Sequence, residues 1–202
     1  MPKCSKQGGR PSRTAFVTIG ATAGFRPLLE EVVSGNFLDA LRSLHFTHLI
    51  VQCGPDLAYF ESIKPKDALK SHGLEISSFS YAPGLNEYFI LASRGKGEVG
   101  ERDCGVIISH AGSGSILDAL ECDSKLVAVP NTSLMDNHQL QIAEDMESKG
   151  FLVHGVLGSI TEAIMKIETF TPRKWPPDTS PNSAYQEGGV WDAINASMPK
   201  AG

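Results

Sequence analysis

Short, continuous apolar runs alternate with helix-length stretches along most of the chain. The runs are rich in Val, Ile, Leu and Phe and occupy residues 15–19, 48–53, 74–81, 105–109, 125–129 and 151–154. Strands that are apolar on both sides are typical of parallel sheets covered by helices on both faces. The pattern therefore predicts a Rossmann-like, doubly wound α/β fold with a mainly parallel sheet, whose ligand site lies at the carboxyl ends of the strands.

The stretches between the runs indicate the domain organisation. Apolar residues at helical spacing predict helices over residues 27–44, 58–69, 115–122, 136–149 and 159–167, with Pro65 interrupting the second. Residues 14–170 then form one Rossmann-like domain. Four prolines in residues 171–183 predict an extended linker, and residues 184–202 are expected to hold a C-terminal helix and tail.

The first 13 residues are basic and are expected to be a disordered tail. A mitochondrial presequence is the competing interpretation, because the segment contains Arg and Lys but no acid, although Gly8, Gly9 and Pro11 oppose an amphipathic helix. No apolar stretch follows that resembles a secretory signal. No run approaches the roughly 20 apolar residues that a membrane span needs. We therefore expect a cytoplasmic protein without a membrane span.

Charge and cysteine content exclude further classes. The 202 residues include 18 Lys and Arg against 23 Asp and Glu, so the net charge is −5. This balance opposes non-specific nucleic-acid binding, which needs a basic surface. The four cysteines have no metal-ligand spacing, and without a secretory signal we expect free thiols, with Cys53 and Cys104 in the core.

A loop of Gly and Ser follows the apolar run 105–109 and leads into a predicted helix. Backbone N–H groups and the dipole at such a helix start suit an anion, in particular a diphosphate. The alternative is a tight turn in which Ser113 or Ser115 caps the helix. Leu117 breaks the dinucleotide fingerprint, and no Walker A lysine is present. The candidate binding residues here are Ser109, Gly112, Ser113, Gly114 and Ser115.

Three neighbouring positions extend this hypothesis. Asp118 lies one helical turn further on, where it could hold a ribose diol or merely complement the helix dipole. His110 is either a ligand contact or a structural hydrogen-bonding group. The first strand-to-helix loop offers Gly20 and Thr22, and Thr22 could lie near a phosphate or an acceptor, or merely cap the turn.

A second polar cluster, residues 131–141, follows the run 125–129 and should face the same crevice. Asp136 and Gln139 fit a capping box, which is a purely structural interpretation. Dense amide and carboxylate groups at a strand end also suit a sugar with many hydroxyl groups. The candidate sugar-binding residues are Asn137, His138 and Gln139.

These motifs, in this order and separation, resemble one family. The segments are Phe16–Thr22, Ile108–Asp118 and Asn131–Gln139. The family is the catalytic subunit of the UDP-N-acetylglucosamine transferase of the asparagine-linked glycosylation pathway. It is similar to the C-terminal half of the bacterial peptidoglycan N-acetylglucosaminyltransferase, and both belong to the GT-B class. Residues 84–104 depart from the pattern, since they are longer and richer in glycine than the expected compact helix.

The resemblance implies a subunit that transfers N-acetylglucosamine from UDP-GlcNAc to dolichyl-diphosphate-GlcNAc, forming a β-1,4 bond with inversion. It implies that Asp118 holds the ribose, that His138 and Gln139 read the sugar, and that backbone near Tyr81–Gly84 reads the uracil. A membrane-anchored partner on the cytosolic face of the endoplasmic reticulum would supply the acceptor site. No bound metal or other cofactor is expected. The general base is unidentified, with His110 as a candidate beside a group in the partner.

The C-terminal stretch carries one apolar stripe at helical spacing. Such a stripe docks either on its own domain or, as the resemblance implies, on the membrane subunit. Its residues are Val190, Trp191, Ile194 and Met198. Two other functions use the same pocket: a non-catalytic nucleotide-sugar-binding regulatory module, and a UDP-sugar epimerase that would act without a partner.

Overall fold

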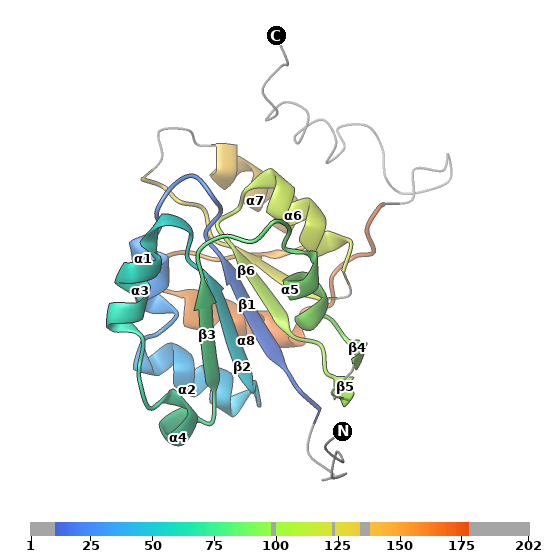
Figure 1. Ribbon diagram of the computed structural model, residues 1–202. Coiled ribbons are helices and arrows are strands. Elements are labelled where there is room, and N and C mark those ends of the chain that lie inside the picture. The colour runs from blue at the N-terminus through green and yellow to red at the C-terminus, as the bar shows by residue number, and fades with distance from the viewer. Residues whose placement is uncertain (1–10, 98–99, 123, 134–137, 178–202) are drawn as a thin grey trace.

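Six parallel strands form the central sheet of the computed structural model, which describes residues 11–97, 100–122, 124–133 and 138–177 (Figure 1). The sheet order is β3-β2-β1-β6-β7-β8, and every neighbouring pair is parallel. The predicted doubly wound parallel sheet is therefore confirmed. Its strands are β1 (Thr14–Thr18), β2 (His48–Gln52), β3 (Glu75–Phe79), β6 (Val106–Ser109), β7 (Lys125–Ala128) and β8 (Val153–His154).

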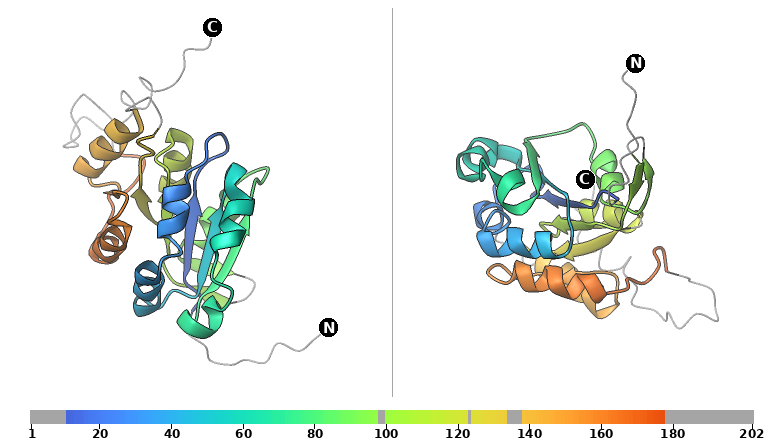
Figure 2. Two further views of the ribbon diagram at one scale, coloured as in Figure 1. Left: turned by 90° about the vertical axis from the view of Figure 1, so that its left-hand side faces the viewer. Right: turned by 90° about the horizontal axis from the view of Figure 1, so that it is seen from below.

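Helices cover both faces of the sheet (Figure 2). The first group packs on one hydrophobic core and comprises α1 (Arg26–Glu31), α2 (Gly35–Ser43), α3 (Leu57–Ile63) and α8 (Ile160–Thr169). The second group packs on the opposite core and comprises α5 (Asn86–Leu91), α6 (Ser113–Leu120) and α7 (His138–Ser148). Alternate residues of β1 serve the two cores, since Ala15 and Val17 join the first and Phe16 joins the second. The short helices η1 (Gly54–Asp56) and α4 (Ala68–His72) complete the crossovers.

The stretch 27–44 is two helices, so the prediction of one continuous helix is wrong. α1 ends at Glu31, and α2 starts afresh after Ser34. The Ser34 side chain accepts a hydrogen bond from the backbone N–H of Phe37 (3.4 Å), which is a helix-capping contact that starts a new helix. The break turns the chain, and both helices still bury their apolar faces in the same core.

The glycine-rich segment before β6 contains a small hairpin. After α5, strands β4 (Gly95–Gly97) and β5 (Gly100–Arg102) pair antiparallel, and Ser12 forms a parallel bridge with Arg102. The segment 84–104 therefore holds the short helix α5 followed by a hairpin, rather than a compact helix alone. The hairpin lies beside the start of the domain, because Ser12 directly precedes β1 and Arg102 shortly precedes β6.

Within the described ranges, Cys53 and Cys122 are free thiols. Cys53 is fully buried, as predicted, whereas Cys104 is only half-buried, so its assignment to the core is wrong. Within the described ranges, no helix combines the length and apolar character needed to cross a membrane.

The chain changes direction across the sheet between β1 and β6. From β1 it winds outward through β2 to β3, and from β6 it winds the other way through β7 to β8. The loops after β1 and β6 therefore leave from adjacent strands toward opposite sides. In open parallel sheets such a switch point opens a crevice at the carboxyl ends of the strands, where ligands bind.

Candidate functional site

Three polar side chains form a row at the carboxyl ends of the central strands. The register places Thr18 opposite both Gln52 and Ser109. The Thr18 hydroxyl donates to Gln52 Oε1 (2.8 Å), and all three side chains are buried. Among the described residues, the buried Ser109 hydroxyl has no hydrogen-bond partner. These three side chains make the carboxyl ends of β1, β2 and β6 polar.

Gln52 holds two of the strand-end loops together. Its Nε2 group donates to the carbonyls of Gly20 (3.0 Å) and Ser80 (2.8 Å), and its Oε1 atom accepts from the Gly20 N–H (3.2 Å). Sequence reasoning missed this residue. The available signal was an amide side chain at the last position of an otherwise apolar strand, where burial requires hydrogen-bond partners.

The His110 ring lies between two glycines. An ideal Cβ on Gly20, which has φ of +81°, would lie 2.7 Å from ring atoms Cε1 and Nε2. A Cβ on Gly112 would lie 2.5 Å from Nε2. The Nδ1 atom is 3.4 Å from the carbonyl oxygen of Thr18. Burial lowers the pKa of His110, which favours a neutral imidazole at neutral pH.

The start of α6 presents an open surface. Gly112 is the N-cap residue, with extended backbone and without a capping side-chain hydrogen bond. The alternative in which Ser113 or Ser115 caps the helix is therefore wrong, because both lie within its first turn. An added Cβ on Gly114 would meet nothing within 4 Å. Residue 111 just before the cap is an alanine with φ of +65°, a backbone conformation that favours glycine.

Asp118 lies one turn along the same helix and is exposed. Its charge adds to the effects of burial and of Glu121 in raising the pKa of Cys122. The carboxylate is thus accessible to solvent, as a group that binds ribose must be. Its contact with ribose stays a prediction.

Asp56, rather than Thr22, holds the start of α1. Thr22 is exposed, and the N-cap of α1 is Phe25, so Thr22 does not cap this helix. The buried Asp56 carboxylate accepts from the N–H of Phe25 (3.1 Å) and from Arg26 Nε (2.9 Å). Gly24 lies so close that a Cβ would be 2.3 Å from Asp56 Oδ2.

The loop after β7 approaches the loop after β1. Asn131 Nδ2 donates to the carbonyl of Gly24 (3.2 Å), and the backbone N–H of Asn131 donates to Gln139 Oε1 (3.1 Å). His138 is exposed at the first described position of α7. The candidate Asn137 lies outside the described residues, as does Asp136 of the suggested capping box.

The remaining candidates are more distant or not described. Tyr81–Gly84 follows the edge strand β3, on the far side of β1 and β2 from β6. The ring of Tyr81 is 55% exposed. The C-terminal stripe, Val190, Trp191, Ile194 and Met198, lies outside the described residues, as does most of the basic tail 1–13.

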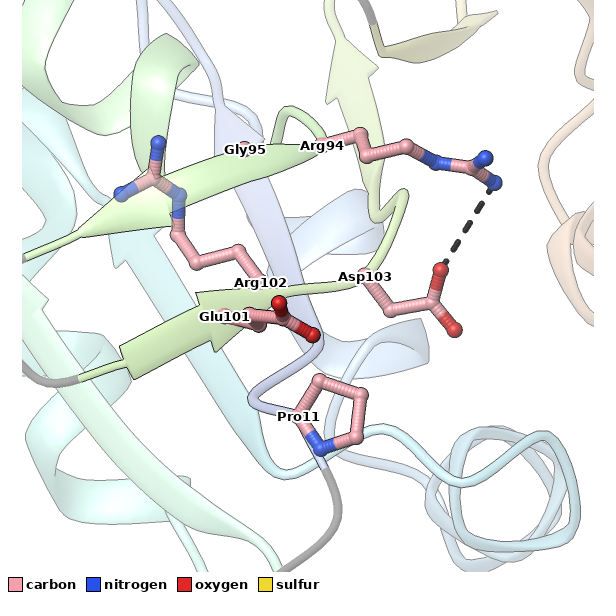
Figure 3. A pocket seen from close by; sticks show the side chains of 6 residues that line it. All are labelled: Pro11, Arg94, Gly95, Glu101, Arg102 and Asp103. Carbon is pink, nitrogen blue, oxygen red and sulfur yellow. Dashed lines mark ion pairs between the residues drawn. The ribbon is translucent and has the colours of Figure 1, made fainter.

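A separate hollow of about 430 Å³ lies beside the β4–β5 hairpin, away from the carboxyl ends of the strands. Figure 3 shows Arg94 pointing toward Asp103, with which it pairs at 3.7 Å, and the Arg102 guanidinium pointing toward the strand that carries Gly95. Pro11 and Glu101 also line the hollow. Its acidic and basic side chains are mixed, whereas the carboxyl ends of β1, β2 and β6 carry the uncharged polar side chains Thr18, Gln52 and Ser109.

Comparison with known proteins identifies the family. The glycosyltransferase family 28 C-terminal domain matches residues 14–185. The UDP-N-acetylglucosamine transferase subunit ALG13 of Yarrowia lipolytica is 35% identical over 138 residues, covering 68% of this chain and 62% of that protein. The ALG13 subunit of Candida albicans is 28% identical over 175 residues, covering 70% of this chain and 56% of that protein. The chain thus spans 56–62% of the length of these two relatives.

Solved structures show the same fold. An NMR solution structure of ALG13 matches with a TM-score of 0.55 and 27% identity, covering 80% of this chain and 89% of that one. A crystal structure of MurG from Acinetobacter baumannii matches in fold with a TM-score of 0.54 and 19% identity, covering 81% of this chain but 42% of that one. The fold is that of one half of a GT-B glycosyltransferase, as predicted. The family domain matches most of its length, and the ALG13 subunit of Saccharomyces cerevisiae is 33% identical over 155 residues with 76% of that protein covered, so this chain belongs to the ALG13 family of UDP-N-acetylglucosamine transferase subunits.

Proposed function

We propose that this chain is the donor-binding subunit of a heteromeric N-acetylglucosaminyltransferase. It transfers N-acetylglucosamine from UDP-GlcNAc to dolichyl-diphosphate-GlcNAc with inversion, forming a β-1,4 bond. Membership of the ALG13 family supports the transferase, and the word subunit in the relatives' names supports a partner. The observation that carries the proposal is the open start of α6 at the switch point, with Gly112 as its cap and no capping side chain.

The diphosphate of the donor would lie against this helix start. Backbone N–H groups of residues 113–115 and the helix dipole stabilise the negative charge that develops on UDP as its bond to the sugar breaks. This arrangement does the electrostatic work without a bound metal ion. Asp118, one turn further along α6, holds the ribose hydroxyls, and Gln139 at the start of α7 reads the sugar.

Inversion requires the acceptor hydroxyl to attack the anomeric carbon from the side opposite UDP and to lose its proton. In this chain His110 is the candidate base, because burial lowers its pKa and keeps the imidazole neutral and able to accept a proton. The alternative source of the base is the membrane-anchored partner. That partner also supplies the lipid-linked acceptor, and we place the complex on the cytosolic face of the endoplasmic reticulum.

Ligand-detected saturation-transfer NMR tests the donor site. We expect uridine and N-acetyl signals from UDP-GlcNAc that UDP competes away, and no signal from NADH. Asp118→Ala should lower UDP affinity by about 1.5–3 kcal/mol, the range for a hydrogen bond to a charged group. Glu121→Ala is the matched control, because it removes a second exposed acid, at the C-cap of the same helix and further from its start. Equal affinities of the two variants would contradict the ribose role.

A transfer assay separates the enzyme from a binding module. With the partner subunit and lipid-linked acceptor present, the proposal expects product that depends on both subunits. Donor binding without any transfer would favour a regulatory role, and conversion of UDP-GlcNAc by the chain alone would favour an epimerase.

A further inference from the structure

Asn131 joins three segments that are far apart in the sequence. Its side chain is 5% exposed and lies just beyond β7. The Nδ2 group donates to the carbonyl of Gly24, 107 residues earlier (3.2 Å), and Oδ1 accepts from the N–H (3.2 Å) and hydroxyl (2.6 Å) of Ser133. Its backbone N–H donates to Gln139 Oε1 (3.1 Å). The residue therefore links β7, the loop after β1 and the start of α7.

These bonds fix which way both amides point. A backbone N–H only donates, so its partner in Gln139 must be the oxygen, and the Gln139 NH₂ group is the end that takes no part in this bond. The same reasoning applies to Asn131, whose oxygen faces the Ser133 N–H and whose NH₂ group faces a carbonyl. All four hydrogen bonds are consistent with this placement of the oxygen and nitrogen atoms in the two side-chain amides.

The contact with Gly24 also connects Asn131 to a rigid part of the first loop. The next residue, Phe25, donates its N–H to the buried Asp56 carboxylate (3.1 Å), and a Cβ on Gly24 would lie 2.3 Å from that carboxylate. The far end of the loop is thus held between Asp56, which follows β2, and Asn131, which follows β7. The side chain of Asn131 is therefore held against the loop at Gly24, and its backbone N–H in turn holds the side chain of Gln139.

We propose that Asn131 is a positioning residue that presents the Gln139 NH₂ group as a hydrogen-bond donor to the sugar of the donor nucleotide. The inference rests on the proposed function, and it names the acceptor atoms of the ligand: hydroxyl or acetyl carbonyl oxygens of the N-acetylhexosamine. The nucleotide part, bound at α6, does not depend on this link. Loss of this link should therefore weaken binding of the sugar without weakening binding of UDP.

The test measures dissociation constants for UDP-GlcNAc and UDP with the full chain co-purified with its partner subunit. Gln139→Glu keeps an oxygen for the Asn131 N–H but replaces the NH₂ donor, so UDP-GlcNAc should bind about three- to tenfold more weakly, the effect of one hydrogen bond. Asn131→Ala should act in the same direction, because the backbone bond remains but its anchor is lost. UDP affinity should change less than twofold in both. Thr132→Ala, at an exposed neighbour, is the matched control.

A double-variant cycle shows whether Asn131 acts through Gln139. In the Gln139→Ala background, Asn131→Ala should leave the ratio of the affinity for UDP-GlcNAc to the affinity for UDP unchanged. A ratio that still falls, or an equal loss of UDP and UDP-GlcNAc in the single variant, would overturn the inference. If Asn131→Ala does not fold, Gln139→Glu decides alone, and wild-type affinity for UDP-GlcNAc in that variant overturns it. A wild-type complex that binds neither ligand overturns the proposed function itself.

Discussion

Replacing Gly20 by alanine adds a methyl group to a backbone in the left-handed region and pushes it against the His110 ring. Gly20 has φ of +81°, and its Cβ would lie 2.7 Å from two ring atoms. The left-handed conformation costs about 1–2 kcal/mol for a residue with a Cβ. Gly112 also lies close to the ring and limits its movement in that direction, so overpacking adds about 1–3 kcal/mol.

Two other glycines separate these contributions. Gly73 has φ of +66° and open space around its Cβ, so Gly73→Ala reports the backbone cost alone. Gly112 has φ of −66°, and its Cβ would lie 2.5 Å from His110 Nε2, so Gly112→Ala reports mainly the clash. Alanine also reduces the entropy of the unfolded chain, which returns about 0.4–1 kcal/mol in each case. The expected losses of unfolding free energy are about 2–4 kcal/mol for Gly20→Ala and about 1 kcal/mol for Gly73→Ala.

Urea unfolding of the variants measures these differences as shifts in midpoint at constant slope. Adding His110→Ala to Gly112→Ala should remove most of the clash, because the ring is gone. If Gly20→Ala loses no more stability than Gly73→Ala, or if removing the ring does not relieve Gly112→Ala, the packing of His110 between the two glycines is refuted.

Three further predictions concern stability, pH and thiol chemistry. Arg13 donates to the carbonyl oxygens of Cys104 (2.9 Å) and Leu44 (2.6 Å) and to the Glu168 carboxylate (2.5 Å). Arg13→Lys should therefore lower the unfolding free energy by about 2–4 kcal/mol, measured as a thermal midpoint lower by about 5–15 °C. Arg42→Lys, at an exposed arginine, is the control and should change the midpoint little. Burial lowers the pKa of His110 in the folded state, so the unfolded chain binds a proton at a higher pH than the folded chain does. The unfolding free energy should therefore fall as the pH decreases below about 6.5. Urea midpoints measured between pH 5 and 8 test this dependence, and the same pH dependence in His110→Gln would contradict it. Burial, with a smaller contribution from Glu61, raises the pKa of the Cys53 thiol to about 12. A thiol reagent at pH 8 should therefore modify Cys53 only after the protein unfolds. Rapid labelling of the folded protein would contradict the burial of this side chain.

The strands could be predicted closely because their pattern is set by burial on both faces. The run 105–109 became β6 (Val106–Ser109), and the run 48–53 became β2 (His48–Gln52), each within one residue at either end. A strand in the middle of a covered sheet leaves little choice of residue type, so composition alone marks it. The loop after β6 was also identified correctly as the connection into a helix.

Other features depend on contacts between distant residues and left no local signal. The hairpin at 95–102 consists of glycines and alternating charges without apolar periodicity. Gln52 and Asp56 anchor the first loop across about 30 residues of sequence, which becomes visible only when the order of the strands is known. The break at Ser34 was hidden because the apolar spacing continues on both sides of it.

The hydrogen bonds of Gln52 couple the loop after β1 to the loop after β3. Because one amide binds both Gly20 and Ser80, neither loop moves away without breaking a hydrogen bond that also holds the other in place. Ordering a loop residue on binding would otherwise cost about 1–2 kcal/mol of conformational entropy. A ligand that spans these loops meets them already in place, so more of its contact energy remains as affinity. One buried side chain in the sheet thereby lowers the entropy that such a ligand must offset when it orders these two loops.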